Sequence, residues 1–98
     1  MLSAIEPVRK VSNETYVSGL RSFYIEYKYR EMDLKNSYAD LKVFRFIEVG
    51  GASKPFLFYV NRRNEVVKVD RPLSDIELDV ILTKGLIVSD LLLQKTSI

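Results

Sequence analysis

The fold is decided by residues 41–69, which read LKVFRFIEVGGASKPFLFYVNRRNEVVKV. Three runs rich in valine, isoleucine, phenylalanine and tyrosine are separated by Gly50-Gly51 and by the polar residues 61–64. β-Branched and aromatic residues favour strands, and glycine or asparagine at a reversal accepts the positive φ that a hairpin turn requires. The stretch therefore predicts two antiparallel hairpins that share their middle strand. Their strands are expected at about 41–49, 55–60 and 65–70.

The length of the Gly-Gly loop decides which side chains of this sheet share a face, because successive residues of a strand point to opposite sides. A loop with an even number of residues puts Val43 and Ile47 on one face with Phe56, Phe58 and Val60, and puts Phe44 and Phe46 on the other with Leu57 and Tyr59. Both faces are then apolar. One short helix covers only one of them, so the other face needs the N-terminal segment, the last ten residues or a second subunit.

Residues 73–78, LSDIEL, carry the clearest local signal. Ser74 and Glu77 have the spacing of a capping box, in which each side chain bonds to the backbone amide of the other residue. Acidic side chains in the first turn suit the positive end of a helix, and Gly85 supplies the left-handed residue that ends it. These features predict a helix at about 75–84, packed on one face of the sheet.

Two further segments complete the predicted fold. Residues 21–30 alternate apolar and polar side chains as a half-buried strand does, although Tyr16, Leu20, Phe23 and Tyr27 also recur at helical spacing and leave a helix open for 13–32. The apolar run 86–93 fits a short second helix, which we prefer, or an edge strand. The chain is therefore expected to be a single α+β domain over 1–98, with an antiparallel sheet of four or more strands, one capped helix and a short C-terminal apolar segment.

Composition limits the classes of protein that fit. The chain has 98 residues, of which 47% are hydrophobic and 29% charged, which is typical of one packed domain and not of a disordered chain. No stretch reaches the roughly 18 apolar residues of a membrane span, and the first ten residues lack the apolar core of a signal peptide. We expect a cytoplasmic protein with no membrane association.

The sequence offers little to catalysis. It contains no histidine and no cysteine, so the usual acid-base group near neutral pH and the thiolate nucleophile are both missing. The helical carboxylates and Ser74 are explained by capping, and the Gly50-Gly51 loop precedes a strand, whereas a phosphate-binding loop precedes a helix. We expect that the protein is not an enzyme and that it has no catalytic residue, no cofactor and no metal site.

Two binding functions remain open. The first is a non-enzymatic protein-binding or assembly module, a homodimer, because the two apolar faces and the run 86–93 exceed what one helix buries. Its expected interface comprises Tyr24, Phe44, Phe46, Leu57, Tyr59, Leu91 and Leu92. The alternative is a small nucleic-acid-binding protein that uses a basic hairpin. The residues expected there are Lys54, Arg62, Arg63 and Lys68, in a chain whose net charge is only +2.

Overall fold

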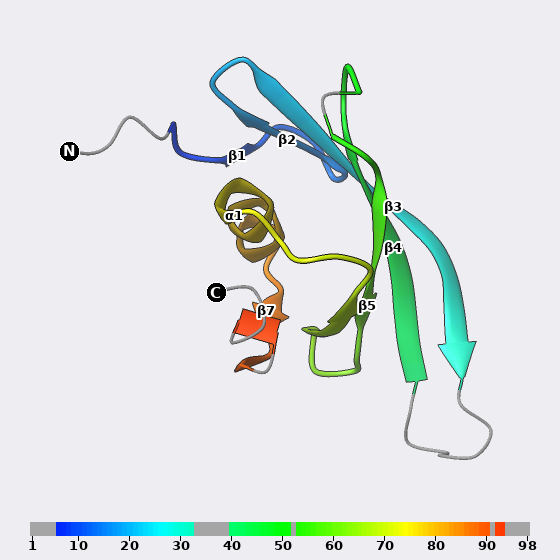
Figure 1. Cartoon of the computed structure of the whole chain (residues 1–98). Helices are drawn as coiled ribbons and strands as arrows, with labels where there is room; N and C mark the ends of the chain where they lie inside the picture. Colours follow the sequence, from blue (N-terminus) through cyan, green and yellow to red (C-terminus); the bar gives the residue numbers. More distant parts are fainter. Residues whose placement is uncertain (1–5, 33–39, 52, 91, 94–98) are drawn as a thin grey trace.

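The structure is a computed structural model that describes residues 6–32, 40–51, 53–90 and 92–93. Within these ranges one helix packs against one curled, seven-stranded sheet, in which the strands follow each other in chain order (Figure 1). The strands are β1 (Arg9–Lys10), β2 (Thr15–Ser18), β3 (Arg21–Met32), β4 (Asp40–Glu48), β5 (Phe56–Val60), β6 (Glu65–Val69) and β7 (Ile87–Val88). Neighbouring strands are antiparallel except for β6 and β7, which are parallel. The α+β class and the four predicted strands are confirmed.

The helix α1 (Asp75–Thr83) lies where its capping box predicts. The Ser74 amide donates to Oε1 of Glu77 at 2.9 Å, and the Glu77 amide donates to Oγ of Ser74 at 3.3 Å. The helix ends at the C-cap Lys84, and Gly85 follows with a φ of +99°. The sheet curls around α1, so the helix covers its concave side, which we call the inner face (Figure 1).

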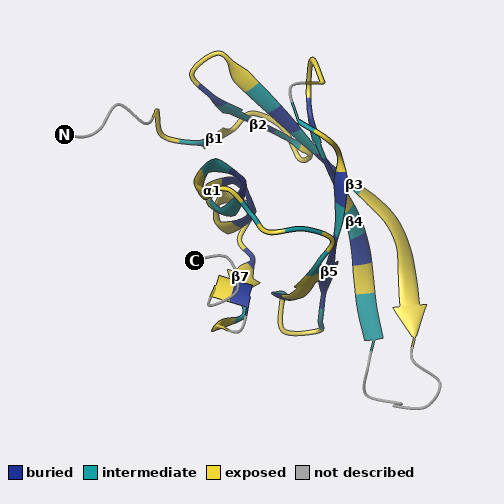
Figure 2. Ribbon diagram, in the orientation of Figure 1, coloured by how far each residue is buried: buried dark blue, intermediate teal, exposed yellow. Residues whose placement is uncertain are grey.

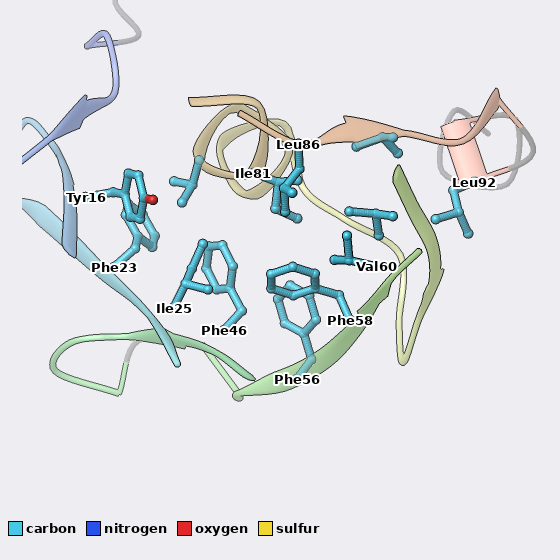
Figure 3. Close-up of a cluster of buried hydrophobic side chains, with 13 residues drawn as sticks. Tyr16, Phe23, Ile25, Phe46, Phe56, Phe58, Val60, Ile81, Leu86 and Leu92 are labelled. Carbon is cyan, nitrogen blue, oxygen red and sulfur yellow. The ribbon is translucent and has the colours of Figure 1, made fainter. Parts of the chain in front are cut away.

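The core fills the space between the inner face and α1 (Figure 3). Phe46 stacks on Phe56 with ring centroids 5.0 Å apart, and Phe44 stacks on Phe58 at 5.4 Å. Figure 2 shows buried residues in the sheet and in α1. The other buried members of the core are Tyr16, Phe23, Ile25, Val60, Val66, Val80, Ile81, Leu86, Val88 and Leu92.

The predicted assignment of side chains to faces is wrong, because the loop after β4 has the opposite parity. The register pairs Phe44 with Phe58 and Phe46 with Phe56, which leaves an odd number of residues between the paired positions. All four of these rings therefore lie on the inner face. The face that α1 does not cover, which we call the outer face, carries Val43 and Ile47 with Leu57 and Tyr59.

The N-terminal half is extended, so the helical alternative for residues 13–32 is wrong. Strands β2 and β3 form a hairpin whose turn, Gly19-Leu20, uses a φ of +59° at the glycine. Strand β3 runs on to Met32, well beyond its pairing with β2, and its register with β4 shifts between Tyr27 and Tyr29. Lys28 is the extra residue of this bulge, and the strand beyond it is exposed (Figure 2).

The C-terminal apolar run is described only in part, because Leu91 and the residues after Leu93 lie outside the described ranges. Leu86 is buried, and β7 pairs with β6 through the positions of Ile87 and Val88. The amides of Leu92 and Leu93 then both donate to the carbonyl of Ser89, at 3.0 and 3.1 Å. The described part of the run thus adds one short strand to the sheet, and Asp90, Leu92 and Leu93 after it are helical.

Candidate functional site

The buried carboxylate of α1 belongs to an ion pair that holds the fold together. Glu77 is 4% exposed and accepts from Nη1 and Nη2 of Arg71 at 2.9 and 2.8 Å. Burial raises the pKa of this carboxyl, but the Arg71 guanidinium and the Ser74 amide outweigh burial, so the pKa lies below its ordinary value. The same guanidinium lies 4.3 Å from the ring centroid of Phe56. The pair thereby fastens the start of α1 to β5.

A second ion pair closes the other end of the core. Glu48 is 5% exposed and accepts from Nε and Nη2 of Arg21, both at 2.8 Å, and from Oγ of Ser53 at 3.2 Å. The hydrogen bonds from Arg21 hold the pKa of Glu48 below its ordinary value. Each of the two buried carboxylates, Glu48 and Glu77, is thus paired with an arginine. In the described part of the chain, no group of three or more acidic side chains could hold a metal ion.

The four basic residues expected to bind nucleic acid do not form one surface. Lys54 precedes β5, whereas Arg62 and Arg63 lie in the turn after it, at the opposite end of that strand. Nε of Arg62 lies 3.5 Å from Oδ2 of Asp40. Lys68 lies on the outer face, with Nζ 4.9 Å from the ring centroid of Tyr59.

The residues expected at a dimer interface divide between the two faces. Tyr24, Leu57 and Tyr59 lie on the outer face, where an interface is feasible. Phe44 and Phe46 lie on the inner face, and Phe46 is a core residue with 1% exposure. Leu92 is also a core residue, and Leu91 lies outside the described ranges. Phe44, Phe46 and Leu92 are therefore unsuited to the role predicted for them, because they already pack within the chain.

The outer face carries an apolar band with one cationic side chain, Arg45, in its middle. Val43 and Tyr59 are buried, whereas Tyr24, Ile47 and Leu57 are half-buried. Among the described residues, no element lies over this side of the sheet (Figure 1). Arg45 projects from the middle of the band, opposite Leu57 in the register, and forms no ion pair with a described residue.

A basic patch on the inner face was not predicted from the sequence. We define the inner-face basic patch as Arg30, Lys42, Arg62 and Lys84. Arg30 and Lys42 oppose each other on β3 and β4, next to the opposed pair Tyr27 and Phe44. Nζ of Lys84 lies 5.1 Å from the ring centroid of Phe44. An open pocket of about 210 Å³ borders the patch, lined by Arg30, Asp40, Lys42, Val60, Asn61, Arg62 and Asn64.

The electrostatics of this patch show that cations accumulate there. Arg30 donates from Nε to Oδ1 of Asp40 at 2.7 Å, and this contact, together with Arg62, holds the pKa of Asp40 below its ordinary value. Burial, aided by repulsion from Lys10 and Lys42, lowers the pKa of Lys84. The bulge at Lys28 creates the arrangement, because without the extra residue Arg30 would point to the outer face.

Comparison with known proteins does not extend these observations, because no family model, no curated protein and no solved structure matches the chain. Within the described ranges, α1 is too short to cross a membrane, and no other helix is a candidate span. The surfaces described above are therefore the basis for any functional argument.

Proposed function

We propose that this protein is a non-enzymatic protein-binding or assembly module that forms a homodimer through the outer face of its sheet. The observation that carries the proposal is the apolar band of Tyr24, Ile47 and Leu57, which no described element covers. An antiparallel sheet with one face in water normally alternates apolar and polar side chains. Here the half-buried outer-face positions of β4 and β5 include Ile47 and Leu57, which favours contact with a second apolar surface.

The distribution of charge supports a second copy of the chain as the partner. Glu26 and Glu31 lie on β3 at one side of the outer face, and Lys68 lies on β6 at the other. Glu26 already has Lys28 at 3.6 Å, which leaves Glu31 as the freer acid. A two-fold axis that lies in the interface and runs along the strands sets β3 of one copy over β6 of the other, so the acidic side of each copy meets the basic side of its partner.

A dimer interface of standard size needs only a small part of the surface of the chain. A standard interface buries about 800 Å² on each partner, which is about one-eighth of the 6646 Å² accessible surface of the chain. Sheets that pack face to face interdigitate side chains in a layer about 10 Å thick, and the half-buried Ile47 and Leu57 suit such a layer. Arg45 then lies near the axis, where Glu26, which opposes it in the register of β3 and β4, is the neighbouring acid.

Light scattering after size-exclusion chromatography tests the proposal. The wild type is expected to have twice the chain mass at micromolar concentration, and Leu57→Glu is expected to be a monomer because it places a charge in the apolar band. Leu82→Glu is the matched control, since Leu82 is 47% exposed on α1, away from the outer face. A wild type that stays monomeric at high micromolar concentration contradicts the proposal.

A charge-exchange experiment tests the two-fold arrangement itself. Glu31→Lys and Lys68→Glu each place like charges opposite one another in a homodimer, so each variant alone is expected to dissociate more readily. A mixture of the two variants restores both acid-base contacts and is expected to form heterodimers. A mixture that associates no better than either variant alone argues against this pairing of β3 with β6.

A further inference from the structure

The inner-face basic patch lies on the side of the sheet opposite the proposed dimer surface. We propose that the inner-face basic patch binds single-stranded nucleic acid, with Lys42 and Lys84 contacting phosphates and Tyr27 stacking on a base. The proposal keeps the nucleic-acid hypothesis but replaces the residues first expected to carry it, of which only Arg62 belongs to the patch. It does not depend on the dimer, because the two surfaces lie on opposite faces.

Two cations of the patch already have an acidic partner, and two have none among the described residues. Arg30 and Arg62 both contact Asp40, so this carboxylate fixes the two guanidinium groups at the border of the pocket. Lys42 and Lys84 form no ion pair with any acid in the described ranges. Three of the four cations thus line the pocket with one paired carboxylate, Lys84 lies beside Phe44, and the two lysines are available to neutralise phosphates.

The aromatic residues among these cations point to a single strand. Tyr27 is 53% exposed, and its ring meets Phe44 edge-on, with centroids 5.7 Å apart and an interplanar angle of 69°. This contact holds the tyrosine ring in place while leaving it accessible for stacking. Phe44 is fixed in turn by its stack on Phe58. A basic surface with exposed aromatic rings is the arrangement that holds unpaired bases without reading their sequence.

The shape of the surface disfavours a duplex. The patch lies on the concave side of a curled sheet, between the end of α1 and the extension of β3 and β4 (Figure 1). Reading a duplex groove requires a helix or ribbon that projects into it, and paired bases offer no free ring face to Tyr27. A flexible single strand can follow the concave surface and present its bases.

Fluorescence anisotropy with a short labelled oligothymidylate and the full chain tests the proposal. Binding is expected at low salt and is expected to weaken as salt is raised. Lys42→Ala and Lys84→Ala should each reduce the slope of log affinity against log salt by about 0.7, which is the value for one phosphate contact on a single strand. Tyr27→Ala should lower the affinity about 5- to 100-fold and leave the slope unchanged, because it removes stacking and no charge.

Matched controls lie outside the patch. Lys54→Ala, at the opposite end of β5, and Tyr29→Ala, on the outer face, change the same residue types and should leave affinity and salt slope as in the wild type. If circular dichroism shows that Tyr27→Ala loosens the fold, Tyr27→Leu replaces it, since leucine keeps apolar bulk without an aromatic ring. Absence of binding at low salt overturns the proposal. Equal binding of a duplex of the same length, or equal losses of affinity in the Lys54 and Tyr29 controls, also overturns it.

Discussion

The ion pair between Glu77 and Arg71 allows a prediction in which one interaction is changed and its neighbours are kept. In Glu77→Gln the glutamine oxygen can still accept from the Ser74 amide, whereas the negative charge and the acceptor for Nη2 of Arg71 are lost. Removing one partner of a buried ion pair costs about 3 to 5 kcal/mol. The Arg71 side chain is 32% exposed, so water compensates it in part, and we expect a loss of about 2 to 3 kcal/mol in the free energy of unfolding.

The dependence of this loss on pH follows from the lowered pKa of Glu77. A carboxyl whose folded-state pKa is lowered stabilises the fold fully above its ordinary pKa, here 4.5, and loses that contribution as pH falls through the folded-state value. The free energies of unfolding of the wild type and of Glu77→Gln should therefore differ most near neutral pH and should become equal in acid. Glu77→Ala also removes the cap and should cost about 1 kcal/mol more than Glu77→Gln at neutral pH.

Urea denaturation followed by far-UV circular dichroism measures these differences as shifts in the transition midpoint at a constant m-value. Asp79→Asn is the control, because Asp79 is an exposed carboxylate on the same helix, and we expect an effect within about 0.5 kcal/mol. The reasoning is refuted if Glu77→Gln unfolds at the wild-type urea concentration at neutral pH. It is also refuted if the gap between the two proteins persists unchanged in acid.

Three further stability predictions use the same urea assay. Ser74→Ala should cost about 1 kcal/mol by removing the acceptor for the Glu77 amide, and an unchanged midpoint would show that this cap contributes nothing. Phe58→Ala should cost about 3 to 5 kcal/mol, because its fully buried ring stacks on Phe44 in the core; a nearly neutral variant would mean that β5 is not buried as described. Gly85→Ala should cost more than about 1 kcal/mol because alanine is strained at a φ of +99°, and a stabilised variant would contradict this C-cap geometry.

The parts of the fold that depend on neighbouring residues were predictable from the sequence. The capping box from Ser74 to Glu77 and the left-handed Gly85 locate the helix, since each acts within a few residues. The turns at Gly50-Gly51 and at Asn64, which has a φ of +61°, likewise locate the hairpins. Local backbone chemistry was therefore sufficient to place these elements along the chain.

The faces of the sheet were not predictable, because they depend on small changes in loop length and strand register. One residue in the loop before β5 moves Phe44 and Phe46 from one face to the other. One extra residue at Lys28 moves Arg30 to the inner face. Neither change has a distinct sequence signal, so the predicted interface included core residues.

Ion pairs between residues far apart in the sequence were also not predictable, because they too depend on strand register. Arg21 and Glu48 are 27 positions apart, and they meet only because β2, β3 and β4 pair in one register. The inner-face basic patch draws its cations from two strands, a turn and the end of α1. The local excess of basic residues in the sequence indicated a binding site at the turn after β5. Only the fold shows that Arg62 of this turn has other basic side chains beside it.

Single-cysteine cross-linking tests most directly whether two copies meet through the outer face. The chain has no cysteine, so Leu57→Cys and Leu20→Cys each introduce one thiol, the first in the apolar band and the second in the fully exposed turn between β2 and β3. Treated with a short bis-maleimide at micromolar concentration, Leu57→Cys should give a covalent dimer under native conditions and none in denaturant, whereas Leu20→Cys should stay largely monomeric. A Leu57→Cys protein that folds as the wild type does and cross-links no more than Leu20→Cys contradicts the account.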